Sequence, residues 1–567
     1  MRSYACLISC LLFLFTTTSL ATSPYSSPVQ KIKADQRIVD KITTPGGETY
    51  VIRYWLRQVT VDHFSNFLTL SHSNTFQLGK YKGSFVLLTK AFWMDSVLVV
   101  FGMAENVDSK DLVVLRLDPV SLQPIDDFVF VDNTSTYSYE RGYEYAVSED
   151  KKQIAVASYD LKEIYEMRRA NDLTSIDNVK KSNASYEFFL LNNKMEVQKK
   201  GELKESAGDK FNTLQQLFVN DNGDIFAVIR EDSAWVKTFE KPVPGIGANQ
   251  MREVIFYYEL PATPEAPEKT NASFNKLHSA SVIYCFRSNG ENLTSRINLE
   301  EKNIENAYLF MNPDKTYSIV GYYSDSALKF SYQVSPDKNA KLLKNIYTRK
   351  INGFIICENV IFGKSIEVSQ RYQFESPVSY DEYVICQEQT KNGTSPEYYT
   401  SRIKINYILQ NPGETIHIVS EVQGYRNGFS LGGAHSIPTN QSLQVLDYSV
   451  SNKSFKMKEI SKSQFTYQES PHLLSYSTIC INNGKCIFYN GFSFDPVYPF
   501  DAYFLLTGSH KSLQYVSTET GNSINDPEIQ AATEGYFVFS EYPELHTGCK
   551  NILLFYNEKG YKLLMFS

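Results

Sequence analysis

The stretch "QLFVNDNGDIFAVI", residues 216–229, contains the pattern that decides the fold. A run of aromatic and branched apolar residues is followed by a polar, turn-forming segment and then by a second apolar run. Asn222 and Gly223 suit tight hairpin turns, because both residue types tolerate positive φ. The stretch therefore predicts two antiparallel strands joined by a short turn.

The same pattern recurs along most of the chain. Its turns lie near residues 95, 149, 221, 312, 411, 482 and 533, with separations from 51 to 99 residues. The spacing is irregular, but each interval is long enough for a four-stranded sheet. The other copies are "KAFWMDSVLVVFG" (90–102), "YAVSEDKKQIAVAS" (145–158), "YLFMNPDKTYSIVGYY" (308–323), "NYILQNPGETIHIVSE" (406–421), "TICINNGKCIFYNG" (478–491) and the weaker "IQAATEGYFVFSE" (529–541).

A second hairpin follows several copies, as in "YEFFLLNNKMEVQKKGEL" (186–203). Two hairpins per unit are what a β-propeller blade contains. A ring of such sheets buries the apolar faces of each sheet against its neighbours. The sequence therefore predicts an all-β propeller of about seven four-stranded antiparallel blades, with six or eight as alternatives. The early segment 57–70 is expected to complete the last blade and close the ring.

The chain also resembles a group of secreted bacterial β-propeller-like proteins of unknown function. The resemblance spans most of residues 84–567, and its motifs are structural. It implies the fold and export, and no functional residues come with it. The residues that carry it are "VLVVFGMAENVDSKDLVVLRLDP" (97–119), "VNDNGDIFAVI" (219–229), "VIYCFRSNGE" (282–291), "IENAYLFMNPDKTYSIVGYYSD" (304–325), "KEISKSQF" (458–465) and "SYSTICINNGKCIFYNG" (475–491).

The N-terminus has the pattern of a secretory signal peptide. Arg2 is followed by an apolar run and by Ser19-Leu20-Ala21, a small-x-small cleavage site. An acylated Cys10 is disfavoured, because most of the apolar run would follow it. We expect residues 1–21 to be a signal peptide, 22–45 a flexible N-terminal segment and 46–567 a single propeller domain. The protein is then secreted, extracellular or periplasmic, without a transmembrane span.

Composition excludes some partners and cofactors. The formal net charge of −7 has no long basic run, so nucleic acid is not expected as a partner. The histidines have no metal-binding spacing, and "NDNGDIF" (220–226) lacks the further acidic ligands of an EF-hand. No metal and no cofactor are expected.

Six of the eight cysteines lie outside the signal segment. A turn within "CINNGKC" could bring Cys480 and Cys486 opposite each other on a hairpin, which would allow a disulfide in an oxidising compartment. The alternative is that the cysteines are buried and reduced. Glycosylation sequons, which a eukaryotic host could use, start at Asn133, Asn183, Asn271, Asn292, Asn392, Asn440 and Asn452.

Ser430 is a weak candidate for a catalytic residue. "GFSLG" (428–432) matches the nucleophile elbow of serine hydrolases, which needs a strand directly before the serine and a helix directly after it. Here "QGYRN" separates the preceding strand from Gly428, and the glycines and Pro438 that follow oppose a helix. The segment is better interpreted as a mobile glycine-rich connection.

These features favour a binding or scaffolding module for a protein or glycan partner over an enzyme. The long insertions 161–185, 232–280 and 423–440 are expected near the mouth of the central channel, and 161–173 has a helical pattern. The alternative is a secreted hydrolase, either a glycan-acting propeller enzyme with carboxylates at the channel or, less favoured, a Ser430 esterase.

Overall fold

The structure is a computed structural model. It describes residues 24–33, 36–105, 109–135, 141–160, 186–203, 210–233, 235–238, 254–257, 279–299, 302–325, 329–334, 342–390, 393–410, 415–430, 433–465, 476–481, 484–490, 513–517, 527–539, 551–557 and 559–566. The described chain is nearly all β, and most of its strands belong to antiparallel sheets that follow one another along the sequence.

The N-terminal half forms sheets built from two consecutive hairpins each. The first contains β3 (Arg37–Thr43), β4 (Thr49–Trp55), β5 (Gln58–Phe64) and β6 (Leu70–Gln77). The second contains β8 (Ser84–Met94), β9 (Val97–Glu105), β10 (Ser109–Leu117) and β11 (Val129–Ser135), and β7 (Lys80–Tyr81) pairs with the start of β8. The third contains β12 (Arg141–Val147), β13 (Ile154–Asp160), β14 (Tyr186–Leu191) and β15 (Val197–Leu203).

The fourth sheet has an added hairpin and an added parallel strand. It contains β16 (Lys210–Val219), β17 (Ile225–Ser233), β20 (Ser279–Phe286) and β21 (Asn292–Asn298), with β26 (Ile366–Glu367) parallel to β21. The hairpin of β18 (Trp235–Thr238) and β19 (Val254–Tyr257) lies between β17 and β20 in the chain.

The next two sets of strands form one continuous sheet. The first set is β22 (Asn303–Met311), β23 (Tyr317–Ser324), β25 (Leu342–Cys357) and β27 (Gln370–Thr390), with β24 (Lys329–Val334) paired to β25. The second set is β28 (Gly393–Gln410), β29 (Thr415–Ser430), β30 (Gly433–Ser449) and β31 (Ser454–Phe465).

Two smaller sheets end the chain. One contains β32 (Tyr476–Ile481), β33 (Gly484–Asn490) and β34 (Leu513–Ser517). The other, the C-terminal sheet, contains β35 (Phe537–Val538), β36 (Ile552–Asn557) and β37 (Gly560–Met565), and β37 pairs with β1 (Tyr25–Ser26) and β2 (Gln30–Lys31). The helix α5 (Pro527–Thr533) precedes β35.

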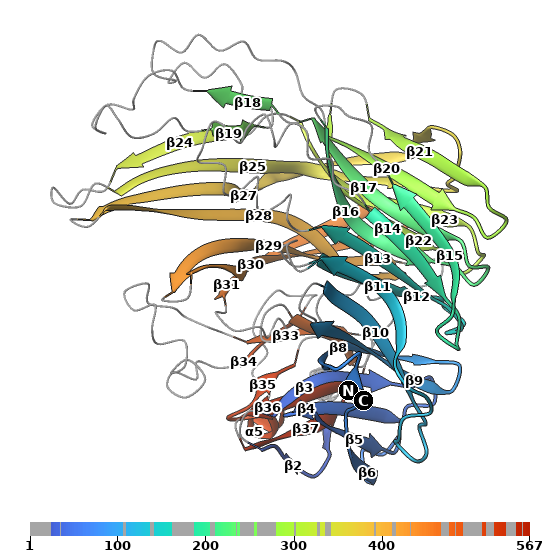
Figure 1. The fold of residues 1–567 in the computed structure, drawn as a ribbon. Helices are drawn as coiled ribbons and strands as arrows, with labels where there is room; N and C mark the ends of the chain where they lie inside the picture. Colours follow the sequence, from blue (N-terminus) through green and yellow to red (C-terminus); the bar gives the residue numbers. More distant parts are fainter. Residues whose placement is uncertain are drawn as a thin grey trace, which may run out of the picture.

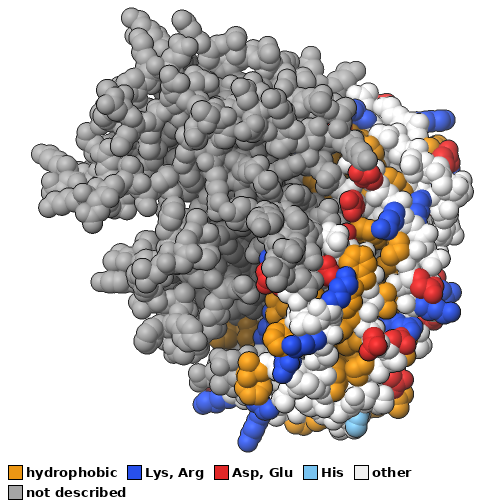
Figure 2. All heavy atoms as spheres, viewed as in Figure 1, with side chains coloured by type: hydrophobic (Ala, Val, Ile, Leu, Met, Phe, Trp, Pro, Cys, Tyr) orange, Lys and Arg blue, Asp and Glu red, His pale blue; other side chains and the backbone are white. Residues whose placement is uncertain are grey.

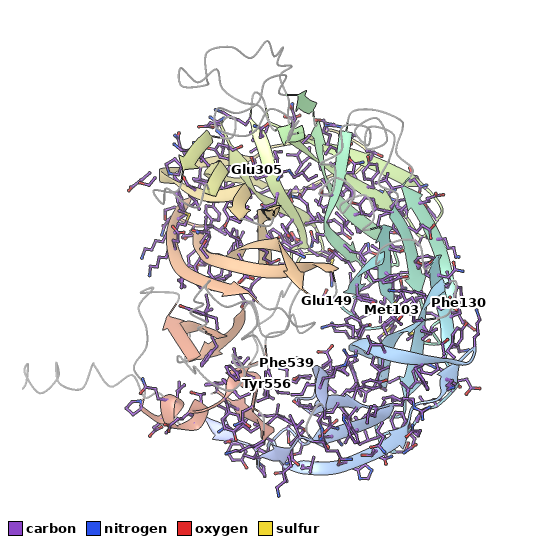
Figure 3. All side chains as sticks on the ribbon, turned by 60° about the vertical axis from the view of Figure 1, so that its left-hand side comes forward. Met103, Phe130, Glu149, Glu305, Phe539 and Tyr556 are labelled. Atoms are coloured by element: carbon purple, nitrogen blue, oxygen red, sulfur yellow. The ribbon has the colours of Figure 1, made fainter. Side chains whose placement is uncertain are left out.

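Hydrophobic clusters connect each set of strands to the next. One cluster joins β3–β6 to β8–β11, and others follow in sequence order up to β28–β31, β33 and the C-terminal sheet. A further cluster joins the C-terminal sheet back to the first sheet, through Leu554 and Leu563 on one side and Val51 and Phe64 on the other. The chain of packed sheets therefore closes on itself, and Figure 3 shows the sheets succeeding one another around a common centre.

The sheets were anticipated by the repeated hairpin pattern, with specific corrections. The predicted hairpins at 145–158, 216–229 and 308–323 are β12–β13, β16–β17 and β22–β23. The weak copy at 529–541 instead contains α5 followed by β35. The first sheet was missed, although Gly46-Gly47 marks its first turn and Gly47 has a φ of 84°.

The segment that meets the C-terminal strand differs from the predicted one. Residues 57–70 contain β5, which pairs with β4 and β6 in the first sheet, so this segment does not complete the last sheet. β1 and β2 pair with β37 instead. These strands and β3 lie within 22–45, which was expected to be a flexible N-terminal segment.

Candidate functional site: the insertion face

The two ends of the strands carry very different connections. In the seven sets from β3–β6 to β32–β34, the turn from the first to the second strand is short, as at residues 95–96 between β8 and β9. The expected insertions 161–185, 232–280 and 423–440 all fall between the second and third strands. Because neighbouring strands are antiparallel, these connections all leave the sheets at the end opposite to the short turns. We call this end the insertion face.

The insertion at 423–440 is a pair of strands. β29 and β30 stay in register from the pair Gln423–Asn440 to the pair Ser430–Gly433. This corrects the prediction of a glycine-rich connection across the whole segment. Residues 161–185, with the helical pattern at 161–173, and most of 232–280 lie outside the described residues.

Several strands extend beyond the packed sheets at this face. Residues 342–351 of β25 pair with 378–388 of β27, and β27 continues into a hairpin with β28 that ends at the pair Thr390–Gly393. Together with β24, β29 and β30 these strands form an antiparallel extension, which runs to the left in Figure 1. The insertion face therefore carries an extension of paired strands beyond the packed sheets.

The backbone around Ser430 does not form a nucleophile elbow. β29 continues to Ser430, and the strand β30 begins at Gly433 and pairs with it. His435 pairs with Gly428 in the same hairpin. An elbow requires a helix at this place, whose N-terminal amides would lie near the nucleophile. A strand supplies no such set of amides, so the backbone gives no support to the Ser430 esterase alternative.

The first strands of successive sheets line the centre. β3 approaches β8, β12 approaches β16, and β22 approaches both β16 and β28. In Figure 3, Glu149, on the turn after β12, lies toward the centre, whereas Phe130 on β11 lies at the outer rim. Side chains on the first strands are therefore the ones that meet at the centre of the molecule.

Many first strands carry a β-bulge at an equivalent position. The register shifts between Ile38 and Asp40 in β3, and the same irregularity recurs in the other strands. A bulge re-aims the side chains next to it. The recurring shifts lie between Leu88/Lys90 in β8, Leu214/Gln216 in β16, Ile304/Asn306 in β22 and Ile405/Tyr407 in β28.

Polar side chains beside these bulges connect neighbouring first strands. Asp40 Oδ2 accepts a hydrogen bond from the Ala91 amide at 3.0 Å. The Gln216 amide group donates to the Leu309 carbonyl at 2.8 Å and accepts from the Leu309 N–H at 2.7 Å. Asn306 Nδ2 donates to the Ile403 carbonyl at 2.8 Å. These side chains satisfy backbone groups that strand pairing leaves open, so their role is to hold adjacent sheets together.

Sequence reasoning missed these residues, although a signal exists. A polar residue precedes the turn by five positions in several copies, as Lys90 does before residue 95 and Gln216 before residue 221. A polar residue within an apolar run looks like ordinary strand alternation. The bulge directs the polar side chain toward the neighbouring sheet, and the bulge is visible only in the structure.

One ion pair joins first strands of sheets that are not neighbours. Lys404 Nζ on β28 lies 3.9 Å from Glu144 Oε1 on β12, and the two side chains are 25% and 21% exposed, respectively. Burial raises the pKa of Glu144, while Lys404 opposes the shift. Burial also raises the pKa of Tyr308, on β22, and the Glu144 charge adds to the shift. β12, β22 and β28 therefore converge on the centre.

Other charged side chains are buried in pairs between or within sheets. Arg230 Nη1 lies 3.2 Å from Glu305 Oε2, and Ser324 also donates to Glu305. Lys462 is paired with Glu421, and both are buried. Such pairs are already neutralised, so they resemble structural contacts more than reactive groups. Within the described ranges, no group of three or more His, Cys, Asp and Glu side chains could hold a metal ion.

The predicted cysteine and glycosylation sites are only partly described. The register of β32 and β33 pairs Cys480 with Lys485 and Cys486 with Ile479, so the two cysteines are not directly opposite. Cys285 and Cys357 are buried free thiols whose pKa burial raises. A disulfide between Cys480 and Cys486 stays a prediction.

The sequon residues fall into two groups. The described side chains that are exposed are those of Asn133, Asn292 and Asn452. Asn440 lies in β30, and its side chain is outside the description, as are residues Asn183, Asn271 and Asn392. Glycosylation is therefore sterically open at the exposed positions and stays a prediction at all of them.

Exposed apolar side chains on the insertion face accompany basic ones. Leu56, between β4 and β5, is 70% exposed, and Phe85 and Leu87 at the start of β8 are 51% and 42% exposed. Arg57 and Lys80 lie over the Phe85 ring, each 4.6 Å from its centroid. Elsewhere on the described surface, Figure 2 shows hydrophobic side chains intermixed with charges of both signs.

Comparisons with known proteins give fold likenesses of low score. No family model and no curated protein matches the chain. An uncharacterized protein of Listeria monocytogenes EGD-e is 10% identical with a TM-score of 0.27, covering 92% of this chain and 99% of its own. An endo-arabinase of Bacteroides thetaiotaomicron is 11% identical with a TM-score of 0.20, covering 53% and 93%. A Synechocystis apocarotenoid oxygenase mutant is 8% identical with a TM-score of 0.26, covering 76% and 75%. These scores are too low to assign the chain a fold or a function.

No helix among the described residues is long and apolar enough to cross a membrane.

Proposed function

We propose that this protein is an exported β-propeller that acts as a binding or scaffolding module for a protein or glycan partner. The closed succession of packed sheets supports a propeller of eight blades, with the β3–β6 sheet as the first and the C-terminal sheet as the last. This proposed count corresponds to the alternative of eight blades, and it adds the N-terminal β3–β6 sheet, which the sequence pattern missed, to the seven repeats.

The observation that carries the binding function is the asymmetry between the two ends of the sheets. The short turns from first to second strands lie at one end, whereas the predicted insertions and the extended parts of β25, β27, β28, β29 and β30 lie at the other. A rigid scaffold that presents long connections on one face is a common architecture for binding. The described polar side chains at the centre connect strands to one another, which favours binding over catalysis at that place.

Export is part of the proposal. The segment 1–21 has the signal-peptide pattern, and β1 begins at Tyr25, a few residues beyond the predicted cleavage site. Cleavage after Ala21 leaves β1 and β2 in the mature chain. N-terminal sequencing of the protein released by its host should therefore find residue 22 first.

The test of function is a screen with the mature chain followed by mapping. A glycan array and an affinity pull-down supply ligands, and hydrogen–deuterium exchange then locates the protected amides. We expect protection on the insertion face, including β29 and β30, and none at the short turns such as residues 95–96. Protection confined to the short-turn end would contradict the proposal, and turnover of a bound glycan or ester would favour the hydrolase alternative.

A further inference from the structure

The insertion face carries a cluster of cations stacked on aromatic rings near the first and second sheets. We call it the cation–aromatic patch and define it by Lys33, Trp55, Leu56, Arg57, Lys80, Phe85 and Leu87. Its centre is the two-residue turn between β4 and β5 and the start of β8. Resting on the proposed binding function, we propose that this patch binds a short acidic peptide segment that also carries apolar side chains.

The cations of the patch are held by aromatic rings. Lys33 Nζ lies 4.8 Å from the centroid of the Trp55 ring. Arg57 and Lys80 both lie 4.6 Å from the centroid of Phe85. Within the described part of the chain, none of these three cations is paired with a carboxylate. A cation held over a ring keeps its charge available to an anionic partner.

The turn at the centre of the patch has an unusual conformation for its sequence. Leu56 and Arg57 have φ angles of 43° and 69°, both in the left-handed region. Two-residue hairpin turns with positive φ strongly favour Asn-Gly, and a bulky residue such as leucine is strained there. Strained residues concentrate at functional sites, so this turn presents Leu56 to solvent at a cost in stability.

The chemistry of the patch selects one class of partner. A sugar would stack on an open aromatic face, but cations already lie over Phe85. An anionic membrane would need a broad basic surface, and the sequence has no long basic run. A short peptide touches only the patch. Its carboxylates would meet Arg57 and Lys80, and its apolar side chains would meet Leu56 and Leu87.

The experiment uses the mature chain and a defined probe. The probe is a fluorescent peptide in which aspartate and glutamate alternate with leucine and phenylalanine, and binding is measured by fluorescence anisotropy. We expect saturable binding that weakens as salt is added. The double variant Arg57→Gln with Lys80→Gln should bind at least about fivefold more weakly, as the loss of two exposed charge contacts predicts. A version of the peptide with glutamine and asparagine in place of its acids should not bind.

Two further variants separate binding from folding. Leu56→Asn places a residue that the left-handed turn favours, so the thermal midpoint should stay level or rise while peptide affinity falls. The double variant Lys194→Gln with Lys453→Gln makes the same charge change at the opposite end of the sheets, on the turns after β14 and β30. We expect it to bind like the unmodified chain.

Several outcomes would overturn the inference. They are an absence of peptide binding, equal affinity of the two double variants, or preferential binding to heparin or to phosphatidylcholine vesicles containing phosphatidylglycerol. If such a result occurs while another ligand protects the insertion face from exchange, the proposed binding function stands and only the acidic peptide is excluded. If no ligand protects that face, both fail.

Discussion

At the scale of single residues, Lys41 shows how a buried charge joins the two ends of the chain. Its Nζ donates a 2.7 Å hydrogen bond to the Ile552 carbonyl, which links β3 in the first sheet to β36 in the last. Burial lowers the pKa of Lys41 to about 8, while Asp40 opposes the shift and Lys90 adds to it. The interaction therefore stabilises the closure of the ring only at the expense of desolvating an ammonium group.

This lowered pKa predicts a pH-dependent stability. Between about pH 8 and the ordinary value of 10.5, the unfolded chain binds more protons at Lys41 than the folded chain does. The free energy of unfolding contributed by this residue should therefore rise as pH increases through that window. Urea unfolding of the natural chain and of Lys41→Met, across the window, measures the contribution. A difference between the two proteins that does not change with pH would contradict the assignment.

Residue-level prediction from sequence was uneven, for a physical reason. Asn222-Gly223 predicts a turn, because few residue types tolerate positive φ, and Gly223 has a φ of 80°. The roles of Asp40, Gln216 and Asn306 were not predicted from the sequence, because their hydrogen-bond partners are backbone groups of a neighbouring sheet. A local backbone preference can be predicted from neighbouring residues, whereas a hydrogen-bond partner many residues away cannot.

At the scale of elements, β1 and β2 attach the N-terminus to the last strand. The Ser27 amide donates to the Leu563 carbonyl at 2.9 Å, and Ser27 Oγ accepts from the Leu563 amide at 2.9 Å. Gln30 pairs with Tyr561 on the same strand. The edge of the C-terminal sheet is thereby covered by a segment from the other end of the chain, which removes an unpaired strand edge.

Deleting β1 and β2 should therefore weaken the closure specifically. A chain starting at residue 34 loses several backbone hydrogen bonds, each worth about 1 kcal/mol. We expect the chain starting at residue 34 to have a lower thermal midpoint than the control. Its amide exchange should accelerate more in β36 and β37 than in β16 and β17. A chain starting at residue 24 retains both strands and serves as the control. Equal exchange in β37 of the two truncated chains would show that these strands do not stabilise it.

The strands with long apolar runs were predicted from the sequence, whereas the shortest strands were not. The hairpins at 90–102, 145–158 and 216–229 have long runs on both sides of the turn, and all are present. The two-residue β1 and β2 have no such run, and β35 is equally short. Short strands gain little from side-chain burial of their own, so their pairing depends on the edge that receives them.

At the scale of the whole molecule, the cluster between the last and first sheets decides whether the structure is a closed ring. Leu554 and Leu112 are both fully buried leucines. Leu554 belongs to the closing cluster, and Leu112 lies between the second and third sheets. In a closed ring these positions are equivalent, because each sheet is covered on both faces.

The closed ring predicts equal penalties at the two positions. Leu554→Ala and Leu112→Ala should each lower the free energy of unfolding by about 2–5 kcal/mol, the usual cost of such a cavity. Both variants should keep a single unfolding transition in calorimetry. An open arc would instead let the terminal sheet detach first, so a separate early transition in Leu554→Ala alone would argue against closure.

The sequence by itself determined the all-β class, the repeated hairpins and the turns, because these depend on residues close together in the chain. Tertiary structure alone decided which sheet meets which, which segment covers β37, and that the insertions share one face. It also set the bulges that turn Asp40, Gln216 and Asn306 toward neighbouring strands. These features depend on contacts between residues far apart in sequence, and the pattern of apolar residues is the same whichever sheets are neighbours.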